Sequence, residues 1–166
     1  EARQRRQCEA GQHWRWDGID FAVLHPERGS TLQGNNASCV LEIATGRQRV
    51  LLTGDIERPV ETGLSYGGRL RPVTVVQVPH HGSRTSSSAS FIAELRADTA
   101  VVSAGYRNRW GFPKEDVVAR WQQSGAKVMT TAASGAIHHR LCRKQGLVIE
   151  TEYRQSAARY WHNSRQ

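Results

Sequence analysis

The sequence predicts an α/β domain with a mixed β-sheet, because three kinds of segment follow one another along its 166 residues. The first part reads as antiparallel hairpins, the middle as apolar strands alternating with helices, and the end as one more hairpin. Strands separated by helices favour parallel pairing, whereas hairpins impose antiparallel pairing. A single layered domain that combines both is therefore expected.

The first half is expected to form two antiparallel pairs. Trp14 and Trp16 alternate with other residues before Asp17-Gly18, a dipeptide that favours a two-residue hairpin turn, and an apolar stretch follows it. A polar loop comes next and includes Asn35-Asn36, which either forms a turn or orients a site group. Two further strands are expected at 39–44 and 49–55.

The second half alternates between apolar runs and helical segments. The run VTVVQVP is typical of a strand covered on both faces. A proline at an opening turn and a glycine at an end mark one helix, and a serine can cap another. The expected elements are helix 56–64, strand 73–79, helix 87–97, strand 99–105, helix 113–125, strand 126–131, a hairpin around RKQG and a polar tail at 155–166.

Composition narrows the function classes. The net charge of +8 favours a polyanionic partner, nucleic acid above all, with a solvated basic surface as the alternative. No run of about 18 apolar residues exists, so no membrane-spanning helix is expected. The chain begins with a charged stretch that lacks methionine and an apolar signal core, so we expect an excised or processed segment. Three cysteines allow either three thiols or one disulfide and one thiol.

Three residues at predicted strand ends are candidates for chemistry. Asp55 follows the apolar strand of LLTGDIE, where Gly54 permits a sharp turn; it either belongs to a site or caps the next helix. His80 and His81 follow a buried strand, and neighbouring residues of an extended strand point to opposite faces. One imidazole could then bind a metal while the other supports it.

Several residues nearby could hold an anion. Ser83 lacks the sequence of a nucleophile elbow, so helix capping or phosphate binding by the small hydroxyl residues is favoured. A loop between strand and helix could contact phosphate or simply be solvated. These candidate substrate-binding residues are Ser83, Arg84, Thr85, Arg107, Asn108 and Arg109.

Taken in order, WRWDGIDFAVLHP, NNASCVLEI, LLTGDIE, VPHHGSRTSSS and VVSAGYRNRWGFP resemble the C-terminal extramembrane domain of ComEC-type competence proteins, from about residue 8 to about residue 150. The resemblance implies the C-terminal portion of an αββα metallo-β-lactamase-like sandwich, over residues 1–154. It also implies a hydrolase with two divalent metal ions, Mn or Zn, that cuts a phosphodiester. Asp55 matches a bridging ligand, and His80 or His81 a second one.

The chain departs from this family in one respect. The family's main metal motif, H-x-[HD]-x-D-H, does not occur here and is expected upstream, so this chain alone is expected to be inactive. Asn35 or Asn36 would be weak substitutes for a further ligand.

The resemblance also implies a cellular setting. It places the domain on the periplasmic side of the bacterial inner membrane, beside the transmembrane channel part of the same protein and the DNA-uptake machinery. Single-stranded or incoming duplex DNA would be the substrate, and a Cys8–Cys39 disulfide would form in that oxidising compartment. Two other functions remain open: a non-catalytic module that binds or guides DNA, and a phosphodiesterase for small molecules.

Overall fold

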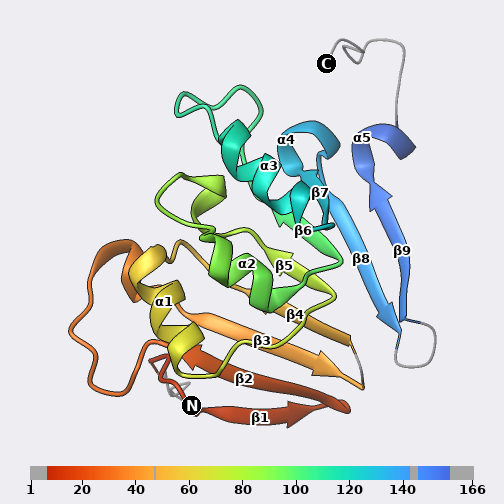
Figure 1. Ribbon diagram of the computed structural model, residues 1–166. Helices are drawn as coiled ribbons and strands as arrows, with labels where there is room; N and C mark the ends of the chain where they lie inside the picture. The colour runs from red at the N-terminus through yellow and green to blue at the C-terminus, as the bar shows by residue number, and fades with distance from the viewer. Residues whose placement is uncertain (1–6, 47, 143–145, 158–166) are drawn as a thin grey trace, which may run out of the picture.

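The computed structural model describes residues 7–46, 48–142 and 146–157 (Figure 1). A mixed sheet of seven strands runs in the order β1 to β7, and β8 pairs with β9 in a second sheet. The predicted α/β class is therefore confirmed. The strands are β1 (His13–Trp16), β2 (Ile19–His25), β3 (Val40–Thr45), β4 (Gln48–Leu52), β5 (Val75–Gln77), β6 (Thr99–Val102), β7 (Lys127–Thr130), β8 (Ile137–Cys142) and β9 (Gly146–Glu152). The helices are α1 (Arg58–Tyr66), α2 (Ala89–Leu95), α3 (Glu115–Gln123), α4 (Thr131–Ser134) and α5 (Tyr153–Ser156), with short 3-10 turns η1 (Gly34–Ala37) and η2 (Pro79–Gly82).

Strands β1 to β4 pair antiparallel; short turns join β1 to β2 and β3 to β4, whereas the longer segment 26–39, which contains η1, joins β2 to β3. The predicted turn joins β1 to β2, and Asp17 and Gly18 both have positive φ, 50° and 76°, as the favoured hairpin turns require. A row of apolar side chains crosses these strands through the registered pairs Trp14–Phe21, Phe21–Ile43 and Ile43–Val50. This row pins the register, because a slip by one residue would turn every side chain to the other face.

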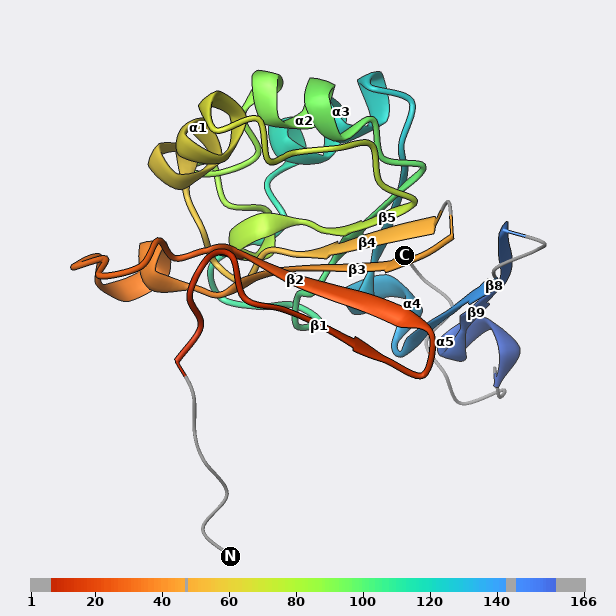
Figure 2. The same ribbon diagram turned by 90° about the horizontal axis from the view of Figure 1, so that it is seen from below.

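Strands β4 to β7 pair parallel, and a helix lies in each of the three connections between them. Helices α1, α2 and α3 all cover the same face of the sheet (Figure 2). Parallel strands also bring their carboxyl ends to one edge of the sheet. The loops after β4, β5, β6 and β7 therefore meet there, which is where open α/β sheets bind ligands.

The core lies between this helical layer and the sheet. Phe91 of α2 and Trp121 of α3 are fully buried against strand residues that include Leu51, Val76 and Ala100. Burying a large apolar side chain contributes roughly 1.5–3 kcal/mol. This packing holds the loops at the carboxyl edge in place.

Helix α2 is capped by a distant carboxylate and not by its own serine. Ser88 makes no side-chain capping hydrogen bond. The carboxylate of Glu61 on α1, which is completely buried, instead accepts hydrogen bonds from the backbone N–H groups of Ser87 and Ser88. The indole of Trp121 donates to the hydroxyl of Ser87 at 3.2 Å, so Glu61, Ser87 and Trp121 together link all three helices.

Most predicted elements are present with shorter bounds. The strand expected at 99–105 ends at Val102, because the chain then leaves the sheet to line a cavity. The short helices α4 and α5 were not predicted, and the turn 143–145 and the tail residues 158–166 lie outside the described residues. In the described part of the chain, no helix is long and apolar enough to cross a membrane.

The structure joins Cys8 to Cys39 in a disulfide with a Cα–Cα distance of 5.9 Å. The bridge ties the chain before β1 to the residue that precedes β3. The thiol of Cys142 is free.

Removing the Glu61 carboxylate should destabilise the fold. Glu61→Ala leaves the buried N–H of Ser87 and the partly buried N–H of Ser88 without an acceptor, so we expect the free energy of unfolding to fall by roughly 2–5 kcal/mol in urea titrations. Glu115→Ala, at an exposed position on α3, is the matched control and should change it by less than about 1 kcal/mol. Equal effects of the two variants would show that the network around Glu61 does not stabilise the domain.

Breaking the disulfide should also lower stability. The bridge closes a loop with a sequence separation of 31, for which the chain-entropy model gives about 3–4 kcal/mol. We expect reductant or Cys39→Ser to lower the urea midpoint, whereas Cys142→Ser should leave it unchanged. An identical midpoint with and without reductant would contradict this pairing.

Candidate functional site

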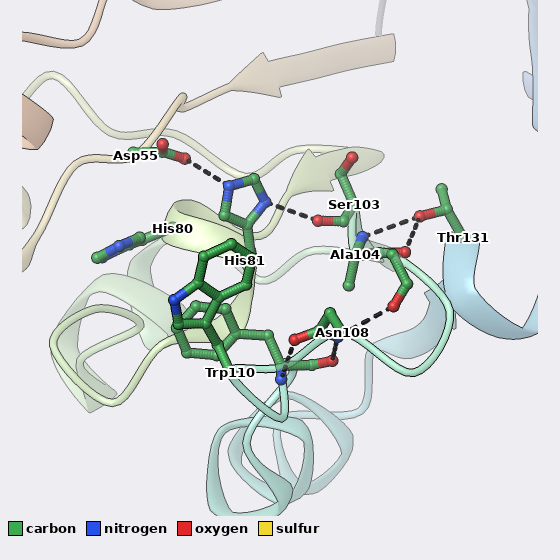
Figure 3. Close-up of a pocket in the computed structure, with 10 residues that line it drawn as sticks. Asp55, His80, His81, Ser103, Ala104, Asn108, Trp110 and Thr131 are labelled. Atoms are coloured by element: carbon green, nitrogen blue, oxygen red, sulfur yellow. Dashed lines mark hydrogen bonds and ion pairs between the residues drawn. The ribbon is translucent and has the colours of Figure 1, made fainter.

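A cavity of about 640 Å³ opens where the loops after β4, β5, β6 and β7 meet. Each loop contributes to its wall, so residues that are far apart in the sequence become neighbours (Figure 3). The lining residues are Asp55, His80, His81, Ser103, Ala104, Gly105, Asn108, Trp110, Phe112 and Thr131.

Asp55 is placed by a tight turn after β4. Gly54 has a φ of 57°, and a Cβ added there would lie 2.8 Å from the Cβ of Ser38, so only glycine fits. The N–H of Asp55 donates to the hydroxyl of Ser38 at 3.1 Å. Helix α1 takes Glu57 as its N-cap residue, so Asp55 does not cap it. The carboxylate of Asp55 faces the cavity instead.

The two histidines lie in a left-handed turn and not on an extended strand. Strand β5 ends at Gln77, and η2 follows with φ values of 49° at His80 and 55° at His81. Such angles are uncommon outside glycine and concentrate at functional sites. Gly82 continues the turn at 79°, where a Cβ would lie 2.6 Å from the Cβ of Pro113. The expectation of an extended backbone was therefore wrong, although the two imidazoles still point to different partners.

His81 is oriented by a backbone carbonyl. Its Nδ1 lies 2.7 Å from the carbonyl oxygen of Ser103, and because a carbonyl only accepts, Nδ1 carries the proton. The other nitrogen, Nε2, lies 3.5 Å from Oδ1 of Asp55 (Figure 3). Two electron-rich atoms at that distance attract a cation between them, whether a proton or a metal ion.

His80 is held by other side chains on both of its nitrogens. The amide of Asn35 donates to Nε2 at 3.3 Å. The opposite nitrogen, Nδ1, lies 3.1 Å from the hydroxyl of Thr85 and 3.3 Å from the carboxylate of Glu57. Both nitrogens of His80 therefore have side-chain partners, and this geometry distinguishes the two histidines where the sequence did not.

Asn36 anchors this second cluster. Its side-chain oxygen accepts from the N–H of Glu57 at 3.0 Å, and its amide donates to the Glu57 carboxylate at 3.3 Å. The carbonyl of Asn36 in turn contacts the buried His25 at 2.8 Å. Both interpretations of Asn35-Asn36 hold: the two residues lie in the 3-10 turn η1, and their side chains contact His80 and Glu57. Sequence reasoning missed Glu57, because only the fold brings it to His80.

The candidate phosphate-binding residues after the histidines lie apart from the cavity wall. The Ser83 hydroxyl is buried and shares a hydrogen bond of 3.1 Å with Thr85, which also donates to Glu57. Arg84 forms an ion pair of 2.9 Å with Asp116. Desolvation raises the pKa of Asp116, but the hydrogen bond and charge of Arg84, together with a backbone hydrogen bond and the charge of Arg120, hold that pKa below its ordinary value.

The loop 105–114 forms the aromatic wall of the cavity. The Asn108 side chain donates to the carbonyls of Gly105 and Phe112 and accepts from the N–H of Phe112, so all three of these hydrogen bonds lie within the loop. Arg107 and Arg109 lie over aromatic rings. Sequence reasoning singled out the charges of this loop and missed its aromatic lining residues, Trp110 and Phe112.

The residues present supply part of a metal site. Asp55 and His81 offer one carboxylate and one imidazole donor that face each other, a ligand pair that suits Zn²⁺ or Mn²⁺. Catalytic zinc sites use three protein ligands for one metal. Within the described ranges, no group of three or more His, Cys, Asp or Glu side chains could hold a metal ion. The pair therefore fits one corner of a metal centre.

Comparisons with known proteins agree with this architecture. The metallo-beta-lactamase superfamily model matches residues 5–106. The chain is 40% identical to Competence protein ComA of Neisseria gonorrhoeae over 140 residues, 83% of this chain and 20% of that protein. It is 38% identical to Recombination protein 2 of Haemophilus influenzae over 130 residues and 34% identical to ComE operon protein 3 of Bacillus subtilis over 128 residues.

The match to Recombination protein 2 covers 78% of this chain, and the match to ComE operon protein 3 covers 77%; each covers 16% of the relative. The chain therefore spans about a sixth to a fifth of the relatives it matches. The predicted resemblance to ComEC-type competence proteins is confirmed. The chain belongs to the metallo-beta-lactamase superfamily.

Proposed function

We propose that the chain is part of a DNA-uptake protein and contributes to a metal-dependent phosphodiesterase that degrades the DNA strand that is not imported. Three observations support this proposal: relatives named for competence, the cavity at the carboxyl edge of the sheet, and the net charge of +8. A basic protein attracts the phosphate backbone of DNA without regard to its sequence.

The observation that carries the proposal is the arrangement of Asp55 and His81. The carboxylate and Nε2 face each other at 3.5 Å, and the Ser103 carbonyl fixes the tautomer of the imidazole. A backbone carbonyl on the second nitrogen is the usual device that orients a metal-binding histidine. We assign Asp55 and His81 as ligands and His80 as a positioning residue that holds the turn.

Bound divalent metal ions would activate water and polarise a phosphoryl oxygen. The chain's own residues have separate tasks. Asp55 and His81 would hold the metal ions, and Arg107 and Arg109 would attract phosphate at the rim. Arg84 is paired with Asp116, so its contribution would be weaker.

The proposal includes a cellular setting. The chain would lie on the periplasmic side of the bacterial inner membrane, joined to the transmembrane channel of the same protein and close to the uptake machinery. The length of the relatives supports one part of this proposal, that the chain is joined to a longer protein, because the matched segment is only 16–20% of each.

A second candidate is a non-catalytic module that binds or guides DNA at the channel. It is favoured by the small number of metal donors in the described residues. The two functions differ in their dependence on Asp55: cutting requires its carboxylate, whereas binding to phosphate does not. DNA binding that weakens with salt and survives Asp55→Ala, without any metal-dependent cutting, would favour the second candidate.

Cutting should require Asp55. We expect the whole protein that carries this chain to cleave plasmid or single-stranded DNA with Mn²⁺ or Zn²⁺ and to stop when a chelator is added. Asp55→Ala should slow cleavage by at least about 100-fold, because a residue that would hold the metal ions is lost. Asp20→Ala, an exposed carboxylate on β2, is the control and should cleave like the unaltered protein. No chelator-sensitive cleavage in the unaltered protein would defeat the phosphodiesterase assignment.

Substitution of the two histidines should have different effects on metal affinity. In the same protein, His81→Ala should weaken Zn²⁺ binding in calorimetric titrations by about 10-fold or more, because a direct ligand is removed. His80→Ala should lower thermal stability, since it breaks contacts to Asn35, Thr85 and Glu57, and should retain most of the affinity. The reverse order of affinities would show that His80 is the ligand.

A further inference from the structure

We propose that the loop 105–114 is a base-stacking platform and that the cavity beside Asp55 and His81 therefore receives unpaired nucleic-acid bases. Trp110 is its principal ring. The proposal rests on the proposed function, because it names the form of nucleic acid that this site would take.

The loop combines exposed aromatic rings with cations. Trp110 is 58% exposed, and the guanidinium of Arg109 lies 4.3 Å from the centre of its ring. Tyr106 is 49% exposed, and the guanidinium groups of Arg107 and Arg154 lie 5.2 and 5.1 Å from its ring. Aromatic rings interleaved with positive charges are the means by which proteins bind single strands, since rings stack on bases and cations contact phosphates.

This combination is concentrated in one place. Among the residues that the structure describes, every cation–π pair involves a ring of this loop. Trp16 on β1 and Tyr66 at the end of α1 are more exposed, at 73% and 90%, but carry no such pair in the same described part. Exposure alone therefore does not produce the pattern.

The loop is held rigidly before any ligand arrives. The three hydrogen bonds of Asn108 close it internally. Lys114 donates from its Nζ to the carbonyl of Trp110 at 2.6 Å, and its backbone N–H donates to the carbonyl of Gly82 at 3.0 Å. A fixed ring loses little conformational entropy on stacking, which favours binding.

The same contacts tie the platform to the candidate metal ligands. Gly82 follows His81 directly and packs against Pro113, so the histidine turn and the loop form one unit. Trp110 lines the cavity that also contains Asp55 and His81 (Figure 3). A base stacked on Trp110 would bring its own phosphates to that cavity. Because the base faces inside a duplex are already covered by their neighbours, only unpaired bases can stack there.

The test is a binding experiment with the 166-residue chain in the presence of chelator, so that no cutting occurs. Fluorescence anisotropy would compare three labelled probes of equal length: a single strand, an abasic strand with the same number of phosphates, and a duplex. We expect the single strand to bind most tightly. Trp110→Ala should weaken single-strand binding by about 10-fold and leave abasic binding unchanged, because only the stacking partner is lost.

Matched variants separate stacking from charge and from folding. Trp110→Phe keeps a ring and should retain most of the single-strand affinity, and Trp16→Ala should behave like the unaltered chain. Arg109→Ala should weaken binding to both strands, because it removes a phosphate contact. Circular dichroism melting of each variant would confirm that the fold is kept.

The proposal is overturned if Trp110→Ala weakens intact and abasic strands equally, if the unaltered chain binds both alike, or if it prefers the duplex. These outcomes are independent of cleavage. If bases stack on Trp110 but the whole protein shows no chelator-sensitive DNA cleavage, only the phosphodiesterase assignment is wrong. If the whole protein cleaves DNA but bases do not stack on Trp110, only the present proposal is wrong.

Discussion

The turn formed by His80, His81 and Gly82 is the constraint on which the candidate site depends. Three consecutive residues adopt left-handed backbone angles, which is costly for the two histidines and is kept only because the surroundings enforce it. Pro113 packs on Gly82, and the Ser103 carbonyl holds the His81 ring. The turn therefore links the ends of β5 and β6 to the start of α3, and it aims the two imidazoles at different partners.

This division explains how one dipeptide can serve two purposes. His80 is held by Asn35, Thr85 and Glu57, so it stabilises the turn, while His81 keeps Nε2 facing Asp55. The loop 105–114 is fastened to the same turn through Lys114 and Pro113. The proposed metal ligand His81, the positioning residue His80 and the proposed base-stacking loop therefore belong to one rigid unit at the carboxyl edge of the sheet.

Local signals in the sequence predicted much of the fold. The hairpin at Asp17-Gly18 and the strand β5, predicted at 73–79 and found at Val75–Gln77, follow from turn preference and an apolar run, which act over a few residues. The cap of α2 by Glu61 could not be predicted, because it joins residues 26 and 27 positions apart. The choice between the histidines and the role of Glu57 also depend on contacts made only after folding.

The central claim is that Asp55 and His81 bind the metal ion. Anomalous X-ray diffraction from crystals of the whole protein soaked in Zn²⁺ tests it most directly, because it locates the ion without reference to activity. We expect a metal peak at about 2.0–2.2 Å from both Nε2 of His81 and a carboxylate oxygen of Asp55, with His80 still bonded to Asn35 and Glu57. A metal ion bound to His80, or one that contacts neither Asp55 nor His81, would contradict the account.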